Sequence, residues 1–261
     1  MKLIKEIFSR NQLLARMGLF FLALAVFLGL YATVNDEEIL GINSMIKPIK
    51  FALSTWAYAW TMAYLLFYVN NQSRVKWYSI LATVVMLYEN GVITIQAFRG
   101  KLSHFNQTEL LGGILYAIMG VMIVWLTTAT LIISLRFIFQ KTSTISKSFA
   151  LSIKIGLILF VIFSFMGGYM SIINSHNIGG KIGEAGLPFI NWSTLFGDLR
   201  VAHFFGIHSL QVIPFLGFYI STNIKNESKA SLFVWIGSII YLVFVCFTMM
   251  QALNGISFIS K

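Results

Sequence analysis

The chain has 261 residues, of which 57% are hydrophobic and only 11% are charged, and its formal net charge is +10. Soluble domains are about one quarter charged, so this composition excludes an ordinary soluble domain and indicates several membrane spans. The single cysteine, Cys246, excludes an internal disulfide and a two-cysteine metal site. No repeat or linker divides the sequence, and we expect one all-α domain over residues 1–261.

The N-terminal segment, residues 1–17, is basic and amphipathic, and an apolar run follows from Gly18 to Val34. This run is longer than the hydrophobic region of a typical signal peptide, and no cleavage motif of small residues follows it. We therefore expect a retained first membrane helix near 17–34 rather than a cleaved signal peptide.

Six further apolar stretches are long enough to cross about 30 Å of hydrocarbon. Pro214, which falls within one of them, is tolerated in a membrane helix because neighbouring groups satisfy the freed backbone. The sequence thus predicts an integral membrane protein with seven transmembrane helices. In chain order, the six further helices are expected near 50–69, 77–98, 111–136, 148–172, 200–222 and 231–253.

Charge is distributed unevenly between the two ends of these expected helices. The N-terminus and the even-numbered loops hold 12 of the 19 basic residues and only two acids, whereas the opposite side holds seven of each sign. The positive-inside rule predicts a cytoplasmic N-terminus, an extracytoplasmic C-terminus and residence in the cell (inner) membrane. Because the basic residues flank membrane spans, they do not indicate nucleic-acid binding.

The stretch MIKPIKF begins the second expected helix at its outer end. Pro48 suits a first helical turn, where the missing N–H is not needed. Lys47 and Lys50 then lie about one turn apart on the same face. We predict that both bind an anionic ligand; the alternative is that their amines extend to the lipid headgroups.

The third expected helix carries Glu89 about ten residues below its outer end, about 15 Å deep by helix rise. An ionisable group at that depth is costly and usually functional, so we predict a catalytic Glu89. The alternative is a protonated side chain that hydrogen-bonds a neighbouring helix. Gln96, Arg99 and Asn106 follow toward the outer loop and are predicted ligand-binding residues.

The sixth expected helix places Arg200, His203, His208 and Gln211 within one arc of about 140°. We predict that Arg200 and Gln211 bind a ligand, that His208 is catalytic, and that both histidines can ligate a metal. Their five-residue spacing is poor for a single metal ion, so a ligand from elsewhere is expected. For each histidine, a hydrogen-bonded packing role is the alternative.

Two outer loops supply the remaining predicted metal ligands, His104 and Asp198. The loop over residues 174–200 is long and contains five glycines. Loops of this length are usually functional or disordered. We interpret it as a lid over an outer pocket, with an interfacial loop anchored by Trp192 as the alternative.

Three sequence blocks resemble a family of bacterial polytopic inner-membrane proteins of uncertain function. They are MIKPIKF, YENG followed by SHFN, and GDLRVAHFFGIHSLQ, and together they extend from the second to the sixth expected helix. The resemblance implies no transferable chemistry. Seven-helix rhodopsins and zinc-dependent seven-helix hydrolases are poor matches, since the last helix lacks a lysine and no HxxxH pair occurs.

These features predict an outward-facing polar pocket between the second, third, sixth and seventh helices. The first hypothesis is a membrane enzyme or redox protein that uses haem or a transition metal, because imidazole and carboxylate ligands suit iron, zinc or copper. The alternatives are a transporter or receptor for an anionic small molecule or lipid headgroup, and an accessory subunit of a membrane complex. The sequence does not determine whether the protein is an enzyme.

Overall fold

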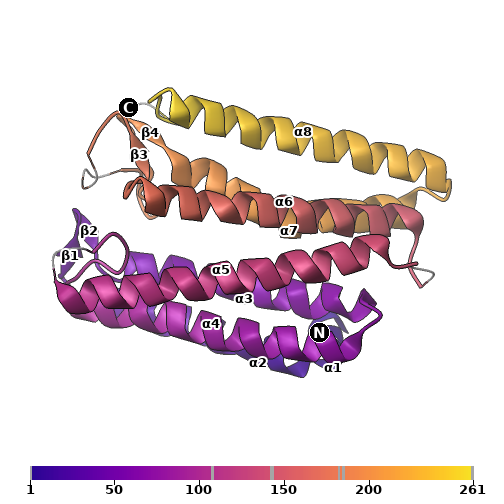
Figure 1. The fold of residues 1–261 in the computed structure, drawn as a ribbon, viewed down its shortest axis with the longest axis horizontal. Helices are drawn as coiled ribbons and strands as arrows, with labels where there is room; N and C mark the ends of the chain where they lie inside the picture. Colours follow the sequence, from indigo (N-terminus) through magenta and orange to yellow (C-terminus); the bar gives the residue numbers. More distant parts are fainter. Residues whose placement is uncertain (1, 107–108, 142–143, 182, 184–185, 260–261) are drawn as a thin grey trace.

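The computed structural model describes residues 2–106, 109–141, 144–181, 183 and 186–259. It is a bundle of long helices that run side by side along the longest axis of the molecule (Figure 1). Its helices are α1 (Lys2–Arg10), α2 (Gln12–Ala32), α3 (Ile46–Leu65), the 3-10 turn η1 (Leu66–Tyr68), α4 (Gln72–Phe98), α5 (Leu110–Phe139), α6 (Lys147–Ile172), α7 (Leu199–Asn223) and α8 (Glu227–Leu253).

Two short antiparallel ladders lie in the connections between helices. The first pairs β1 (Glu38–Ile39) with β2 (Ile42–Asn43), and the second pairs β3 (Asn177–Ile178) with β4 (Gly197–Asp198). Both lie at the end of the bundle that also carries the C-terminus (Figure 1). We call this end, with its segments 33–45, 99–109 and 173–198, the loop end.

The all-α fold is confirmed, and each expected membrane helix corresponds to one long helix whose ends lie within five residues of the prediction. Among the described residues, six helices are long and apolar enough to cross a membrane, namely α2, α4, α5, α6, α7 and α8. They indicate a multi-pass membrane protein in a lipid bilayer. The expectation of seven such helices differs from this finding at α3.

Helix α3 is not among these six helices, and its sequence contains two lysines, a proline and several hydroxyl and aromatic residues. Its polar side chains are used inside the bundle rather than presented to lipid. The Tyr58 hydroxyl lies 2.5 Å from that of Tyr78 on α4, and the Trp60 indole donates to the Ala15 carbonyl on α2. Burial among other helices therefore explains the lower hydropathy of α3.

At the opposite end, α1 packs against the end of α3 through one arginine. The guanidinium of Arg10 lies over the rings of Tyr64, Phe67 and Tyr68 and donates to the Tyr64 carbonyl. Asn11 then caps α2 by accepting a hydrogen bond from the Leu14 amide. These contacts hold the basic N-terminal helix against the bundle.

Helices α6 and α7 share the most extensive helix contact in the described chain. Small residues make it possible: a Cβ atom on Gly206 would overlap Phe163, and one on Gly217 would overlap Ser152. Small residues let helix backbones approach closely in membranes. The main apolar core contains residues from all of the helices α1 through α5, together with residues of α6 and α7. These helices therefore pack as one bundle, and α7 begins at its loop end (Figure 1).

Candidate functional site

The buried carboxylate of Glu89 lies on α4 toward the loop end, with only 7% of the residue exposed. His104, from the segment between α4 and α5, brings its Nε2 atom to 3.6 Å from Glu89 Oε1. In the described part of the chain, Glu89 Oε2 has no hydrogen-bond partner. Lys47 on α3 lies near enough to attract the carboxylate electrostatically. An acid and an imidazole from two elements thus meet here, and an amine from a third element acts on them electrostatically.

Aromatic rings surround His104. The centroids of the Phe51 and Tyr116 rings each lie 5.6 Å from that of the imidazole, and the Ser103 hydroxyl lies 3.2 Å from Nδ1. Phe105, the next residue, has a φ of 57°, which is uncommon outside glycine. Burial, together with the Lys47 cation, holds the pKa of His104 well below its ordinary value. His104 is therefore neutral at pH 7.

A second cluster forms around Asp198, which caps the N-terminus of α7 and is 1% exposed. Its carboxylate accepts hydrogen bonds from the amides of Ser193 and Arg200 and from the Arg200 guanidinium, at 2.6 Å for Nη2. His176 Nδ1 lies 3.7 Å from Oδ1. Burial alone would raise the pKa of Asp198, but Arg200 holds it below its ordinary range. Asp198 is thus an ionised partner of Arg200.

Two cations connect the long segment 173–198 to the helices. Lys50 on α3 donates to the Ile190 carbonyl at 2.8 Å, and Arg200 on α7 donates to the Asn191 carbonyl. Phe189 and Asn191 both have positive φ values, of 63° and 54°, so the chain turns sharply around these carbonyls. The segment is therefore attached to both α3 and α7.

Trp192 does not reach a membrane surface as the interfacial-loop interpretation requires. Its side chain is buried against the rings of Phe204, Phe205 and Phe258. An aromatic ring at the membrane interface would instead be exposed at headgroup level. Trp192 is thus a buried packing residue rather than the exposed anchor that this alternative expected.

The two α7 histidines make local hydrogen bonds. His203 Nδ1 lies 2.8 Å from the Phe163 carbonyl on α6, and His208 Nδ1 lies 3.1 Å from Gln211 Oε1. The His208 ring also packs against Phe204. Within the described ranges, neither imidazole lies within ion-pair distance of a carboxylate. These contacts are of the packing kind that the sequence left as the alternative.

The predicted metal ligands fall in separate places. His104 lies beside Glu89, Asp198 is bound to Arg200, and His203 and His208 lie along α7. No three histidine, cysteine, aspartate or glutamate side chains lie close enough to hold a metal ion among the residues that the structure describes. The physical reason is that Asp198 and both α7 imidazoles already have partners. This arrangement gives the metal and haem hypothesis no support.

Gln96, Arg99 and Asn106 connect the segment that carries His104 to α4. Gln96 accepts a hydrogen bond from Arg99 at 2.6 Å and donates to the Leu102 carbonyl, to which Asn106 also donates. Arg99 lies 3.5 Å from Glu109. These predicted ligand-binding residues thus position the turn between α4 and α5.

Sequence reasoning did not include His176 or the carbonyls of Ile190 and Asn191 in the site. His176 lies 22 residues before Asp198, and no periodicity connects a loop residue to a distant partner. The two carbonyls belong to the backbone, so no side-chain type signals them. A long loop between two charged helix ends was the available indication.

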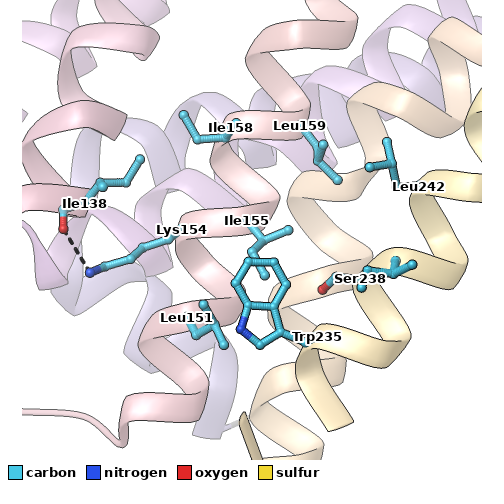
Figure 2. Close-up of a pocket in the computed structure, with 10 residues that line it drawn as sticks. Ile138, Leu151, Lys154, Ile155, Ile158, Leu159, Trp235, Ser238 and Leu242 are labelled. Carbon is cyan, nitrogen blue, oxygen red and sulfur yellow. Dashed lines mark hydrogen bonds between the residues drawn. The ribbon is translucent and has the colours of Figure 1, made fainter. Parts of the chain in front are cut away.

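An apolar groove lies elsewhere, between α5, α6 and α8 (Figure 2). Its volume is about 320 Å³, and Trp235, Leu151 and Ile155 contribute to its lining. The Lys154 amine turns aside to donate to the Ile138 carbonyl at 2.9 Å. None of its lining residues belongs to the polar clusters of the loop end, so the groove is distinct from the predicted polar pocket.

Comparisons of the chain with protein-family models, with curated proteins and with solved structures give no match. The resemblance to a bacterial membrane-protein family therefore stays a prediction. The site is interpreted from its own residues alone.

Acid should weaken the second cluster through His176. Burial, reinforced by Arg200, lowers the pKa of His176 to about 4, so between pH 6.5 and 4 the unfolded chain binds more protons at this residue than the folded chain. We expect the free energy of unfolding to fall as pH falls through this window. At pH 4.5, the loss of unfolding free energy should be about 2 kcal/mol smaller in His176→Gln than in the wild type. Unfolding measured in mixed micelles from pH 7 to 4.5 tests this, and equal slopes for wild type and variant contradict it.

Proposed function

We propose that the protein binds an anionic ligand at the loop end, through a cationic site formed by Lys47, Lys50 and Arg200. Lys47 and Lys50 lie in the first turns of α3, and Arg200 lies in the first turn of α7. All three repel one another electrostatically, which indicates that their charges lie close together. Asp198 balances the charge of Arg200, but three cations against one carboxylate leave an excess of positive charge that a bound anion would offset.

The observation that carries the proposal is the state of Lys47. Within the described ranges, its amine makes no ion pair or hydrogen bond, although it lies near two other cations. Glu89 attracts it electrostatically, but the two form no ion pair in the described chain. The amine lies over the face of the Phe51 ring, 5.9 Å from the ring centroid, so its N–H donors are available to bind an anion.

The other two cations keep some donors free while they hold the protein. Lys50 uses one N–H for Ile190, and Arg200 uses Nε and Nη2 for Asp198 and Asn191. Within the described chain, Arg200 Nη1 makes no hydrogen bond. The N-cap of α3, Met45, has no side-chain hydrogen bond there either, so the positive end of this helix adds to the site. The ligand chemistry is that of a phosphate, sulfate or carboxylate group.

The proposal includes the membrane topology predicted from charge. The loops opposite the cationic site hold most of the basic residues, so the site faces the extracytoplasmic side and α3 is the seventh span. At that depth, the anion is either a lipid headgroup or a small solute from outside. A receptor or transporter of anions accounts for the geometry better than a metal-dependent enzyme does, since the histidines are dispersed.

The test is the thermal stability of the purified protein in detergent with added sulfate. We expect saturable stabilisation by sulfate, and none by chloride at equal ionic strength, because a ligand that binds only the folded state stabilises it. Nanodiscs of anionic phosphatidylglycerol, compared with zwitterionic phosphatidylcholine, separate the two sources: stabilisation by phosphatidylglycerol alone identifies a headgroup. Absence of stabilisation by either anion overturns the proposal.

A further inference from the structure

We infer that anion binding in the cationic site is coupled to the uptake of one proton by Glu89. This inference rests on the proposed function. The proton comes from solvent and adds to the free Oε2 atom, forming one O–H bond and breaking no other bond in the protein. The ligand and the proton would therefore bind together.

Lys47 lies close to both the anion site and the acid. It lies about one helical turn before Lys50 on α3. Its amine lies 5.9 Å from the centroid of the Phe51 ring, and that ring packs against His104, the neighbour of Glu89. Without a ligand, Glu89 is the negative charge that acts on this amine among the described residues. When an anion binds beside Lys47, the negative charge of the ligand balances the positive charge of the amine. Glu89 then becomes an uncompensated buried carboxylate, which is expensive unless it is protonated.

Few other groups near Glu89 could accept the proton. Among the described residues, Glu89 interacts with the Lys47 amine from α3 and with the His104 imidazole, at 3.6 Å, from the segment between α4 and α5. On α4 itself, Tyr88 lies next to it. His104 is neutral, and its Nδ1 lies beside Ser103. The atom open to protonation is Glu89 Oε2, which has no partner among the described residues.

Linkage fixes the direction of the effect. If binding requires protonated Glu89, the affinity for the anion falls as pH rises through the range where Glu89 ionises in the free protein. Above that range, one linked proton gives about a tenfold loss of affinity for each pH unit. Sulfate is the suitable probe because it does not titrate between pH 5 and 9, so a change in affinity reports on the protein.

The experiment is isothermal titration of the purified protein with sulfate in two buffers of different ionisation enthalpy. We expect uptake of about one proton for each sulfate bound by the wild type. Glu89→Gln should bind sulfate with no proton uptake and no pH dependence. His104→Gln is the matched variant. It should keep the proton uptake, because the imidazole that it replaces is neutral and takes up no proton in the wild type.

The possible outcomes separate the two proposals. Sulfate binding by the wild type without proton uptake overturns the coupling and leaves the anion site standing. Unchanged uptake in Glu89→Gln, or loss of uptake in His104→Gln alone, assigns the proton elsewhere and also overturns it. No sulfate binding at any pH overturns the proposed function itself. Absence of proton uptake by the wild type overturns the coupling even if Glu89→Gln does not fold.

Discussion

Replacing Asp198 with alanine should lower the free energy of unfolding by about 3 kcal/mol, since removing one partner of a buried ion pair leaves the other uncompensated. The carboxylate is 1% exposed and accepts from the Ser193 and Arg200 amides and the Arg200 guanidinium. Its loss removes the cap of α7 and frees the segment that Arg200 holds at Asn191. Unfolding by denaturant in mixed micelles measures the change.

Asp36→Ala is the matched control. Asp36 lies in an exposed connection at the same loop end, so its removal should change stability by less than about 0.5 kcal/mol. Asp198→Asn should fall between the two, because an amide keeps an acceptor but not the charge. Equal stability of Asp198→Ala and Asp36→Ala would show that the Asp198 cluster does not hold the loop end together.

Lys47→Met should affect ligand binding rather than stability. Sulfate affinity should fall by about 30-fold or more, while the free energy of unfolding of the ligand-free protein stays the same or rises. The cost of burying this cation, together with repulsion from Arg200 and Lys50, opposes its attraction to Glu89 in the folded state. Methionine keeps the apolar stem and removes the charge. Titration calorimetry and unfolding of the same preparation give both quantities.

Two further lysines sharpen this result. Lys50→Met should lower both affinity and stability, because Lys50 also holds the Ile190 carbonyl. Lys101→Met, which removes an exposed amine at the same end, should change neither. A Lys47→Met protein that loses stability and keeps its sulfate affinity would make Lys47 a structural residue and remove the basis of the anion site.

The positions of the helices could be predicted because membrane spans are specified by local composition. Long apolar runs bounded by charge marked each helix to within five residues, as for the span expected at 148–172 and found at Lys147–Ile172. Helix α3 was expected on length alone. Its lower hydropathy follows from burial among other helices, which only the tertiary structure reveals.

The site was less predictable, because its contacts depend on how loops fold. Helical spacing correctly placed Lys47 and Lys50 in neighbouring turns at the start of α3, and membrane depth singled out Glu89. The same spacing put His203 and His208 on one polar face. It could not show that their Nδ1 atoms lie beside the Phe163 carbonyl and the Gln211 amide.

The anion site is tested most directly by anomalous scattering from crystals grown with selenate, which replaces sulfate. We predict a selenium peak whose oxygens lie about 2.8 Å from the Lys47 amine, with Lys50 or Arg200 as a second donor. A peak confined to surface lysines, or none beside Lys47 in crystals that contain saturating selenate, would contradict the account.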